Sequence, residues 1–139
     1  MEPGDRFGPS SWIEIPQSKI DAFAAATDDH QWIHVDPNRA AAGPFGTTIA
    51  HGYLTLSLLP VASYEVVPRQ GGSMSINYGL NRVRFPAPVP VGSRVRATFE
   101  VMSVEPVDGG KQITMTATVE RDTGEKPVCV AEIVFRYYD

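Results

Sequence analysis

The second half of the chain alternates regularly between apolar and polar residues. Residues 95–101 and 113–119 carry apolar side chains at every second position, a pattern typical of half-buried strands. The Asp-Gly-Gly sequence at 108–110 lies between them and favours a hairpin turn. Residues 129–137 alternate in the same way after a further turn. The pattern therefore predicts three successive antiparallel strands.

Another strand is predicted over residues 74–85, although its alternation changes phase halfway. Apolar side chains occupy even positions before Gly79 and odd positions after it. One extra residue in a strand moves the following side chains to the other face, so a β-bulge near Gly79 would bring the two halves into one phase. Residues 10–15 precede Pro16 and predict a short strand that enters the fold.

Two short helical patterns lie in the first half of the chain. Apolar residues recur at helical spacing over residues 18–27, and Ser18 and Asp21 have the spacing of a capping box, with Asp in place of Glu or Gln. This helix should end near Asp28. Residues 38–42 are expected to form one further helical turn after Pro37.

Residues 51–67 are apolar on nearly every side, which predicts a long buried helix. Pro60 removes a backbone donor, so the helix should kink or restart there, and Pro68 should end it. Together the elements predict an α+β domain in which a curved antiparallel sheet wraps around one long central helix, preceded by a small helical cap. A chain of 139 residues is expected to form one domain, residues 1–139.

Composition narrows the range of functions. Hydrophobic residues make up 42% and charged residues 20%, and the formal net charge of −4 argues against general affinity for nucleic acid or an anionic membrane. Cys129 is the only cysteine, so no intrachain disulfide can form, and its place in an apolar stripe predicts a core residue. The start of the chain has no export signal and no apolar run is long enough to span a bilayer, so a cytoplasmic location is expected.

The ionisable residues gather in residues 28–37, which hold two of the three histidines and three carboxylates. Asp29 and His34 are the candidate acid–base pair. Five residues along a straight helix would place their side chains about 140° apart, so they can cooperate only if the chain folds back between them. Asp28 and Asp36 are expected to be loop and capping carboxylates.

His30 and His34 are four residues apart and Asp36 is nearby, so the two histidines could share a face and hold a metal if this stretch were helical. The two histidines lack the intervening Glu of the metalloprotease pattern, and Pro37 argues against a continued helix. We therefore expect no metal.

Three motifs resemble those of the MaoC-like, R-specific enoyl-CoA hydratases. Residues 29–36, Asp-His-Gln-Trp-Ile-His-Val-Asp, look like that family's Asp-x-Asn-x-x-His-x-Asp signature, and residues 49–52 and 84–92 are similar to its helix start and central-strand motif. The resemblance covers about residues 10 to 138. It implies the hotdog fold, an acyl-CoA thioester substrate, no cofactor apart from the coenzyme A of the substrate, and a homodimer with active sites at the subunit boundary.

The resemblance also implies residue roles. Asp29 and His34 match the catalytic pair, and Gly52 matches the glycine whose backbone N–H faces the thioester oxygen. The residues expected to contact the substrate around them are Gln31, Trp32, His51, Tyr53 and Arg84. Many members have Asn where Gln31 stands and Pro where Trp32 stands. The coenzyme A phosphates would meet scattered cations such as Arg39, Arg82, Arg84 or Lys111.

This chemistry needs three groups. A base activates water for attack at C3 of a trans-2-enoyl thioester, an acid protonates C2, and donors hold the enolate oxygen that forms between the two steps. An imidazole pKa near 6.5 suits His34 as a base at neutral pH. The sequence leaves open which member of the pair is the acid.

Two other functions remain open. A hotdog thioesterase would need a carboxylate on or facing the central helix, and residues 51–67 carry no acid until Glu65. A non-catalytic acyl-thioester binding subunit would keep the fold without needing Asp29 and His34. The expected function is R-specific hydration of trans-2-enoyl-CoA to 3-hydroxyacyl-CoA, or the reverse dehydration.

Overall fold

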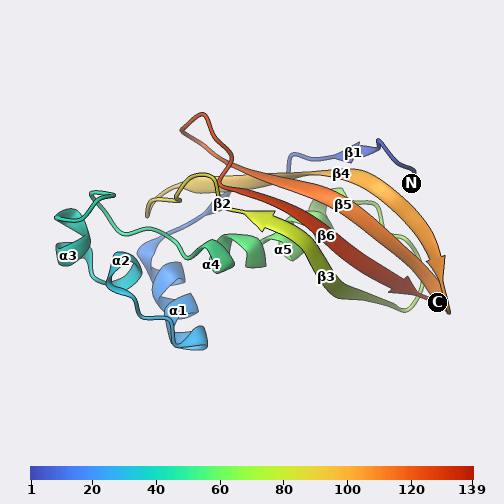
Figure 1. The fold of residues 1–139 in the computed structure, drawn as a ribbon, viewed down its shortest axis with the longest axis horizontal. Helices are drawn as coiled ribbons and strands as arrows, with labels where there is room; N and C mark the ends of the chain where they lie inside the picture. Colours follow the sequence, from blue (N-terminus) through green and yellow to red (C-terminus); the bar gives the residue numbers. More distant parts are fainter.

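The computed structural model describes residues 1–139. One curved antiparallel sheet lies above a layer of helices, and three further helices extend from one end (Figure 1). The elements in chain order are β1 (Arg6–Phe7), β2 (Ile13–Glu14), α1 (Gln17–Thr27), α2 (Trp32–Val35), α3 (Pro37–Ala41), α4 (Gly52–Ser57), α5 (Leu59–Val66), β3 (Met74–Arg84), β4 (Arg94–Val107), β5 (Gly110–Arg121) and β6 (Cys129–Tyr138). The α+β arrangement predicted from the sequence is confirmed.

The sheet is built on the long β4–β5 hairpin. Its strand order is β1-β4-β5-β6-β3, and β2 also pairs with β4. Val107 pairs with Gly110, so Asp108 and Gly109 form a two-residue turn in which Gly109 has φ +78°. Such a turn requires positive φ, which glycine adopts without steric cost. The three strands predicted from the alternation are confirmed.

Strand β3 contains the predicted irregularity near Gly79, but a second one follows. Its pairing with β6 shifts between Asn77 and Gly79 and again between Leu80 and Arg82. Two insertions cancel in phase, because side chains alternate with a period of two. The prediction that a bulge near Gly79 would bring the apolar side chains of both halves of β3 onto one face was therefore wrong. The apolar side chains of the first half lie on the outer face of the sheet, and those of the second half face the helices.

The central helix consists of two short helices, α4 and α5, that end and restart at Leu58. Pro60 lies in the first turn of α5, where a backbone N–H would have no partner within the helix, so its absence costs no hydrogen bond. The restart is confirmed, but the expectation of burial on every side was wrong. Tyr53, Val61 and Tyr64 are 70%, 55% and 76% exposed, because the sheet covers only one side of these helices.

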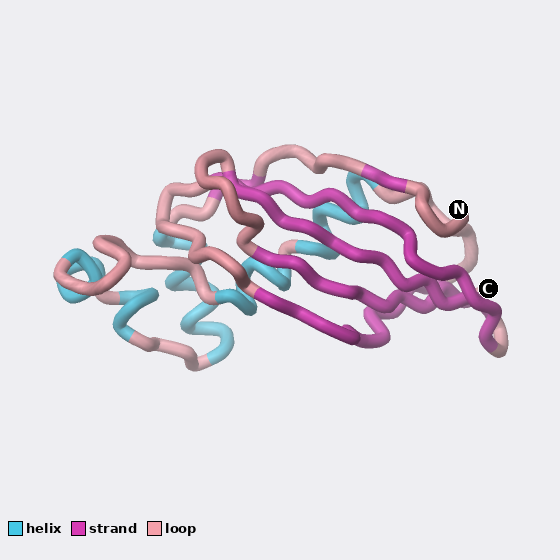
Figure 2. Tube along the Cα trace, turned by 45° about the horizontal axis from the view of Figure 1, so that its top comes forward, coloured by secondary structure: helices cyan, strands magenta, loops and turns pink.

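Helices α1 to α3 form the predicted cap and lie beyond the end of the sheet, away from both termini (Figure 2). Pro16 is the N-cap of α1 and no side chain caps it, so the predicted capping box does not form. Asp21 instead accepts a hydrogen bond from Gln17. Asp28 ends α1 in the left-handed conformation, and Asp36 caps α3 by accepting from the Arg39 N–H. The single turn of α2 was not expected.

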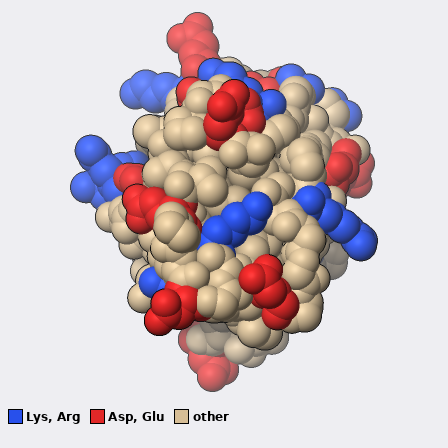
Figure 3. All heavy atoms as spheres, turned by 90° about the vertical axis from the view of Figure 1, so that its right-hand side faces the viewer, with Lys and Arg blue, Asp and Glu red and all other residues tan.

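The core lies between the inner face of the sheet and the helices. Ile15, Ile20 and Phe99 are fully buried in it, and Cys129 joins them, as predicted. Burial raises the pKa of the Cys129 thiol to about 11. At the end of the molecule that carries the termini, cationic and anionic side chains are interspersed (Figure 3). None of the helices combines the length and the apolar character needed to cross a bilayer.

Candidate active site

His34 is held in place by hydrogen bonds at its backbone and at its ring. It lies in α2 and is 7% exposed. The Gln17 side chain donates to its carbonyl oxygen at 2.8 Å, and its ring Nδ1 lies 2.6 Å from the Ile49 carbonyl oxygen. A carbonyl oxygen only accepts, so Nδ1 carries the proton and Nε2 presents a lone pair. His34 therefore has the tautomer of a base that acts through Nε2.

The surroundings of His34 favour its neutral form. Burial lowers the pKa of His34 below its ordinary value and is the largest cause. The hydrogen bond to Ile49 and the Asp29 carboxylate act in the opposite direction, whereas His51 lowers this pKa further. The balance keeps an uncharged imidazole available at neutral pH.

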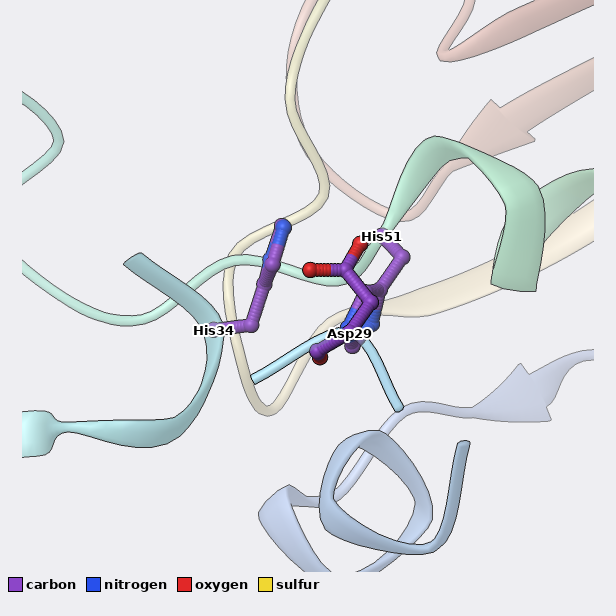
Figure 4. A group of neighbouring side chains, drawn as sticks. All are labelled: Asp29, His34 and His51. Carbon is purple, nitrogen blue, oxygen red and sulfur yellow. The ribbon is translucent and has the colours of Figure 1, made fainter. Parts of the chain in front are cut away.

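Asp29 reaches the same point from the loop after α1 (Figure 4). Asp29 is exposed, and one of its carboxylate oxygens accepts a hydrogen bond from the Gln31 N–H at 3.4 Å. The left-handed turn at Asp28, with φ +60°, redirects the chain so that Asp29 and His34 converge although they lie in different elements. The fold-back required by their spacing is thus present.

A third residue completes the cluster. His51 lies directly before α4 and its ring stacks on that of His34 with centroids 3.9 Å apart. Asp29, His34 and His51 each offer an atom able to bind a metal, and these atoms lie within 4.8 Å of one another. The sequence singled out His30 and Asp36 as possible companions of His34, but His30 is exposed and Asp36 caps α3.

Gly52 begins α4, and its N–H has no hydrogen-bond acceptor, as expected for the first position of a helix. It lies beside a cavity of about 310 Å³ that His34 also lines. Apolar residues from 85–89 form much of the cavity wall, together with Phe45, Ile49 and Val128. Of the candidate residues, only His34 and Gly52 line this cavity, and Asp29 lies at the His34 end.

The other candidate substrate contacts lie around this centre rather than in it. Gln31 is exposed and forms the N-cap of α2. Trp32 packs within the helical cap, where the Arg39 guanidinium lies 4.4 Å from its ring centroid. Tyr53 is exposed and meets the Phe85 ring edge to face at 6.4 Å. Arg84 is exposed and donates to the Val83 carbonyl.

Sequence reasoning missed two parts of the site. The Ile49 carbonyl fixes the His34 tautomer, but a backbone acceptor leaves no signal in residue types. A second, apolar cavity of about 260 Å³ lies between α4, α5 and strands β3 and β6. Its lining includes Leu56, Leu59, Leu80 and Phe135. Thr55 of α4 lines the first cavity and the next residue, Leu56, lines the second, so this helix contributes to both.

Glu65, the only acidic residue of the central helices, is hydrogen-bonded away from both cavities. One of its carboxylate oxygens accepts from both the N–H and the hydroxyl of Ser11. It ties the start of the chain to α5, and it does not line either cavity. This role differs from that of the free carboxylate that a thioesterase mechanism would require.

Known proteins are similar to this chain in both sequence and fold. A family model described as a MaoC like domain matches residues 1–125. The 3-hydroxyacyl-thioester dehydratase Z of Mycobacterium tuberculosis is 57% identical over 135 residues, which cover 96% of this chain and 89% of the relative. The chain is also similar to the solved structure of the R-hydratase PhaJ1 from Pseudomonas aeruginosa, with 27% identity, a TM-score of 0.81, and coverage of 100% and 83%. The (R)-hydratase from Aeromonas caviae gives 28% identity, a TM-score of 0.81, and coverage of 99% and 97%.

The fold is therefore the hotdog fold, and the protein is a hydro-lyase that hydrates or dehydrates its substrate. The chain belongs to the MaoC-like dehydratase family.

Proposed function

We propose that this enzyme catalyses R-specific hydration of trans-2-enoyl-CoA thioesters, or the reverse dehydration. One observation carries the proposal. His34 and Gly52, whose N–H is unpaired, line one cavity, and the Asp29 carboxylate lies beside His34, whose Nε2 presents a lone pair.

The proposed roles follow from the hydrogen bonds. His34 Nε2 takes a proton from water as the water oxygen bonds to C3, and electrons of the C2–C3 double bond move onto the thioester oxygen. The Gly52 N–H stabilises this oxyanion, a contribution of roughly 3 to 4 kcal/mol for one such donor. A proton from the Asp29 and His34 pair is then delivered to C2, which restores the carbonyl. Water is added across the double bond and the pair returns to its starting state.

The acyl tail is assigned to the second cavity. Its wall is mainly apolar, and α4 contributes residues to both cavities. The coenzyme A part would remain outside, where Arg39 and Arg84 are exposed. Lys111 is less suited to this role, since it donates to Gln70 and lies beside the β4–β5 turn, next to the C-terminal end of β6. The proposed reaction uses no metal or cofactor, and coenzyme A is present only as part of the substrate.

We further propose that the enzyme is a homodimer. Strand β3 pairs with β6 on one side only, and ten of its eleven residues are exposed. An unpaired strand edge of this length is normally covered in a stable protein. Exposed Tyr53 and Tyr64 on the helices add apolar surface that a second copy would cover. The cytoplasm stays the predicted compartment.

The decisive experiment follows loss of absorbance at the enoyl-thioester band with crotonyl-, octenoyl- and dodecenoyl-CoA, together with chiral analysis of the product. We expect absorbance loss and an R-3-hydroxyacyl product, unchanged by prior treatment with a chelator. Absorbance loss with release of free thiol, and without a 3-hydroxyacyl product, would indicate a thioesterase. Binding of the thioesters without turnover would indicate a non-catalytic subunit.

A further inference from the structure

His51 is buried in a way that needs an explanation. It is 2% exposed, yet its Nδ1 has no hydrogen-bond partner. Leaving such an atom unpaired typically costs about 1 to 3 kcal/mol. An apolar residue at this position would avoid that cost. The contacts of the remaining ring atoms therefore indicate why a histidine lies here.

The other ring nitrogen of His51 binds the backbone of Asp29. Nε2 lies 3.0 Å from the Asp29 carbonyl oxygen. Because a carbonyl oxygen only accepts, Nε2 must donate, which assigns its proton to Nε2 and leaves the lone pair on Nδ1. This hydrogen bond joins residues 22 positions apart in the sequence, from the loop after α1 to the start of α4.

The Asp29 backbone has few other restraints. The preceding residue, Asp28, is the only non-glycine residue with positive φ, and the residues from 25 to 31 are all exposed. The other hydrogen bond at Asp29 is the 3.4 Å contact from Gln31, which lies in the same loop. The His51 N–H is therefore the bond that fixes Asp29 relative to the rest of the fold.

The face of the His51 ring contacts the other member of the pair. It lies against the His34 ring at 3.9 Å between centroids, with 23° between the planes, and meets Phe23 at 4.9 Å. The Ile49 carbonyl fixes one atom of the His34 ring, and the stacked face of His51 restricts rotation of its plane. One side chain thus contacts both Asp29 and His34.

We propose that His51 is a positioning residue that sets the geometry of the Asp29 and His34 pair, through its Nε2–H on the Asp29 backbone and its ring face on His34. The inference rests on the proposed hydratase function. It goes beyond that function, because His51 need not touch the substrate. A displacement of about 1 Å of a reacting group can cost roughly 100-fold in rate, so loss of either contact should be visible in turnover.

Three variants separate the two contacts. His51→Phe keeps an aromatic face and removes the N–H, His51→Gln keeps an N–H donor and removes the ring, and His51→Ala removes both. We expect kcat to fall roughly 10-fold in each of the first two and roughly 100-fold in the third, with KM changed by less than about 2-fold. The matched control is Ile20→Val, a change at a fully buried position of α1 that lowers stability and lies outside the contacts described for the pair.

A double-mutant cycle distinguishes positioning from general loss of structure. If His51→Phe acts through Asp29, it should change the residual turnover of Asp29→Asn by less than about 2-fold, whereas a purely structural loss would multiply in both backgrounds. Equal factors in the two backgrounds, or folded His51 variants with wild-type kcat, would overturn the inference. A wild-type enzyme without hydratase activity would instead refute the proposed function.

A measurement on the unaltered protein covers the case in which the variants do not fold. Long-range ¹H–¹⁵N correlation spectra of the imidazole rings report which nitrogen carries the proton. We expect the proton of His51 on Nε2 and that of His34 on Nδ1. Finding the His51 proton on Nδ1 would exclude the bond to Asp29 and with it the inference.

Discussion

Phe85 lies against the side of Gly52 from which a side chain would project. A Cβ built on Gly52 comes within 2.9 Å of two ring carbons of Phe85, closer than real Cβ atoms approach their neighbours. Phe85 is 42% exposed, so its ring has room to move. A substitution at Gly52 thus combines two effects, displacement of this ring and any change to the backbone N–H.

Gly52→Pro and Gly52→Ala separate these effects. Both add the same Cβ, but only proline removes the N–H, and His51 with ψ 138° has the extended backbone that a residue before proline requires. We expect Pro to reduce turnover roughly 100-fold or more beyond the loss caused by Ala, with similar melting temperatures.

Phe85→Ala serves as the background that removes the crowding. In it, Gly52→Ala should approach the turnover of the Phe85→Ala parent, whereas Gly52→Pro should remain impaired. If both recover, the contribution of Gly52 is steric access and not hydrogen bonding.

Asp29 and His34 should behave as one unit. Asp29→Asn and His34→Ala are each expected to lower turnover by at least about 100-fold, with the double mutant little worse than the poorer single variant. The physical reason is that, in the proposed mechanism, both groups belong to one acid–base unit that serves the same water. Initial rates at saturating crotonyl-CoA provide the measurement, and losses that multiply would show that the two residues act separately.

The pH dependence should follow His34. Its neutral form is the proposed base, and burial lowers its pKa, so the acidic limb of kcat/KM should lie below about 6.5, the ordinary pKa of imidazole. A lowered pKa also means that the unfolded chain binds the proton more readily. The free energy of unfolding should therefore decrease as the pH falls from about 6.5 through the pKa of folded His34. His34→Gln should lose this part of the decrease in denaturant titrations.

The exposed edge of β3 should mediate dimerisation. Sedimentation at micromolar concentration should give about twice the 15.2 kDa mass of one chain. Ile76→Lys places a charge on this strand and should shift the mass toward that of one chain. Met102→Lys, at a comparably exposed position on β4, is the control and should leave the mass unchanged.

Chain-length preference should depend on the second cavity. Leu80 lines it from β3 and is 48% exposed, so a larger side chain there can fill the cavity with little strain in the core. Leu80→Trp is expected to lower kcat/KM for dodecenoyl-CoA at least about 10-fold while changing the value for crotonyl-CoA less than about 2-fold. An equal loss on both substrates would remove this cavity as the place of the acyl tail.

Alternation and turn residues predicted the sheet well, because strands β4 to β6 bury one face and expose the other. The spacing of Asp29 and His34 predicted that the chain must fold back between them. The structural features that produce this fold-back could not be predicted. The fold-back depends on the left-handed backbone of Asp28, on the single turn of α2 and on carbonyl groups of Ile49 and Asp29. These features leave no distinctive pattern of residue types.

Exposure of the central helices could not be predicted from polarity either. Tyr53 and Tyr64 are apolar enough to suggest burial, yet the sheet reaches only one side of α4 and α5. A pattern of residue types shows which surfaces avoid water and leaves open whether the same chain or another one covers them.

The reactivity of Cys129 can report on local opening of the native protein. The thiol is fully buried beside Val119 at the start of β6, and its raised pKa disfavours the reactive thiolate. A thiol-specific reagent can therefore modify the native chain only when the core around Cys129 opens. Because no other cysteine competes, the rate of modification measures how often this part of the core opens, without any added label.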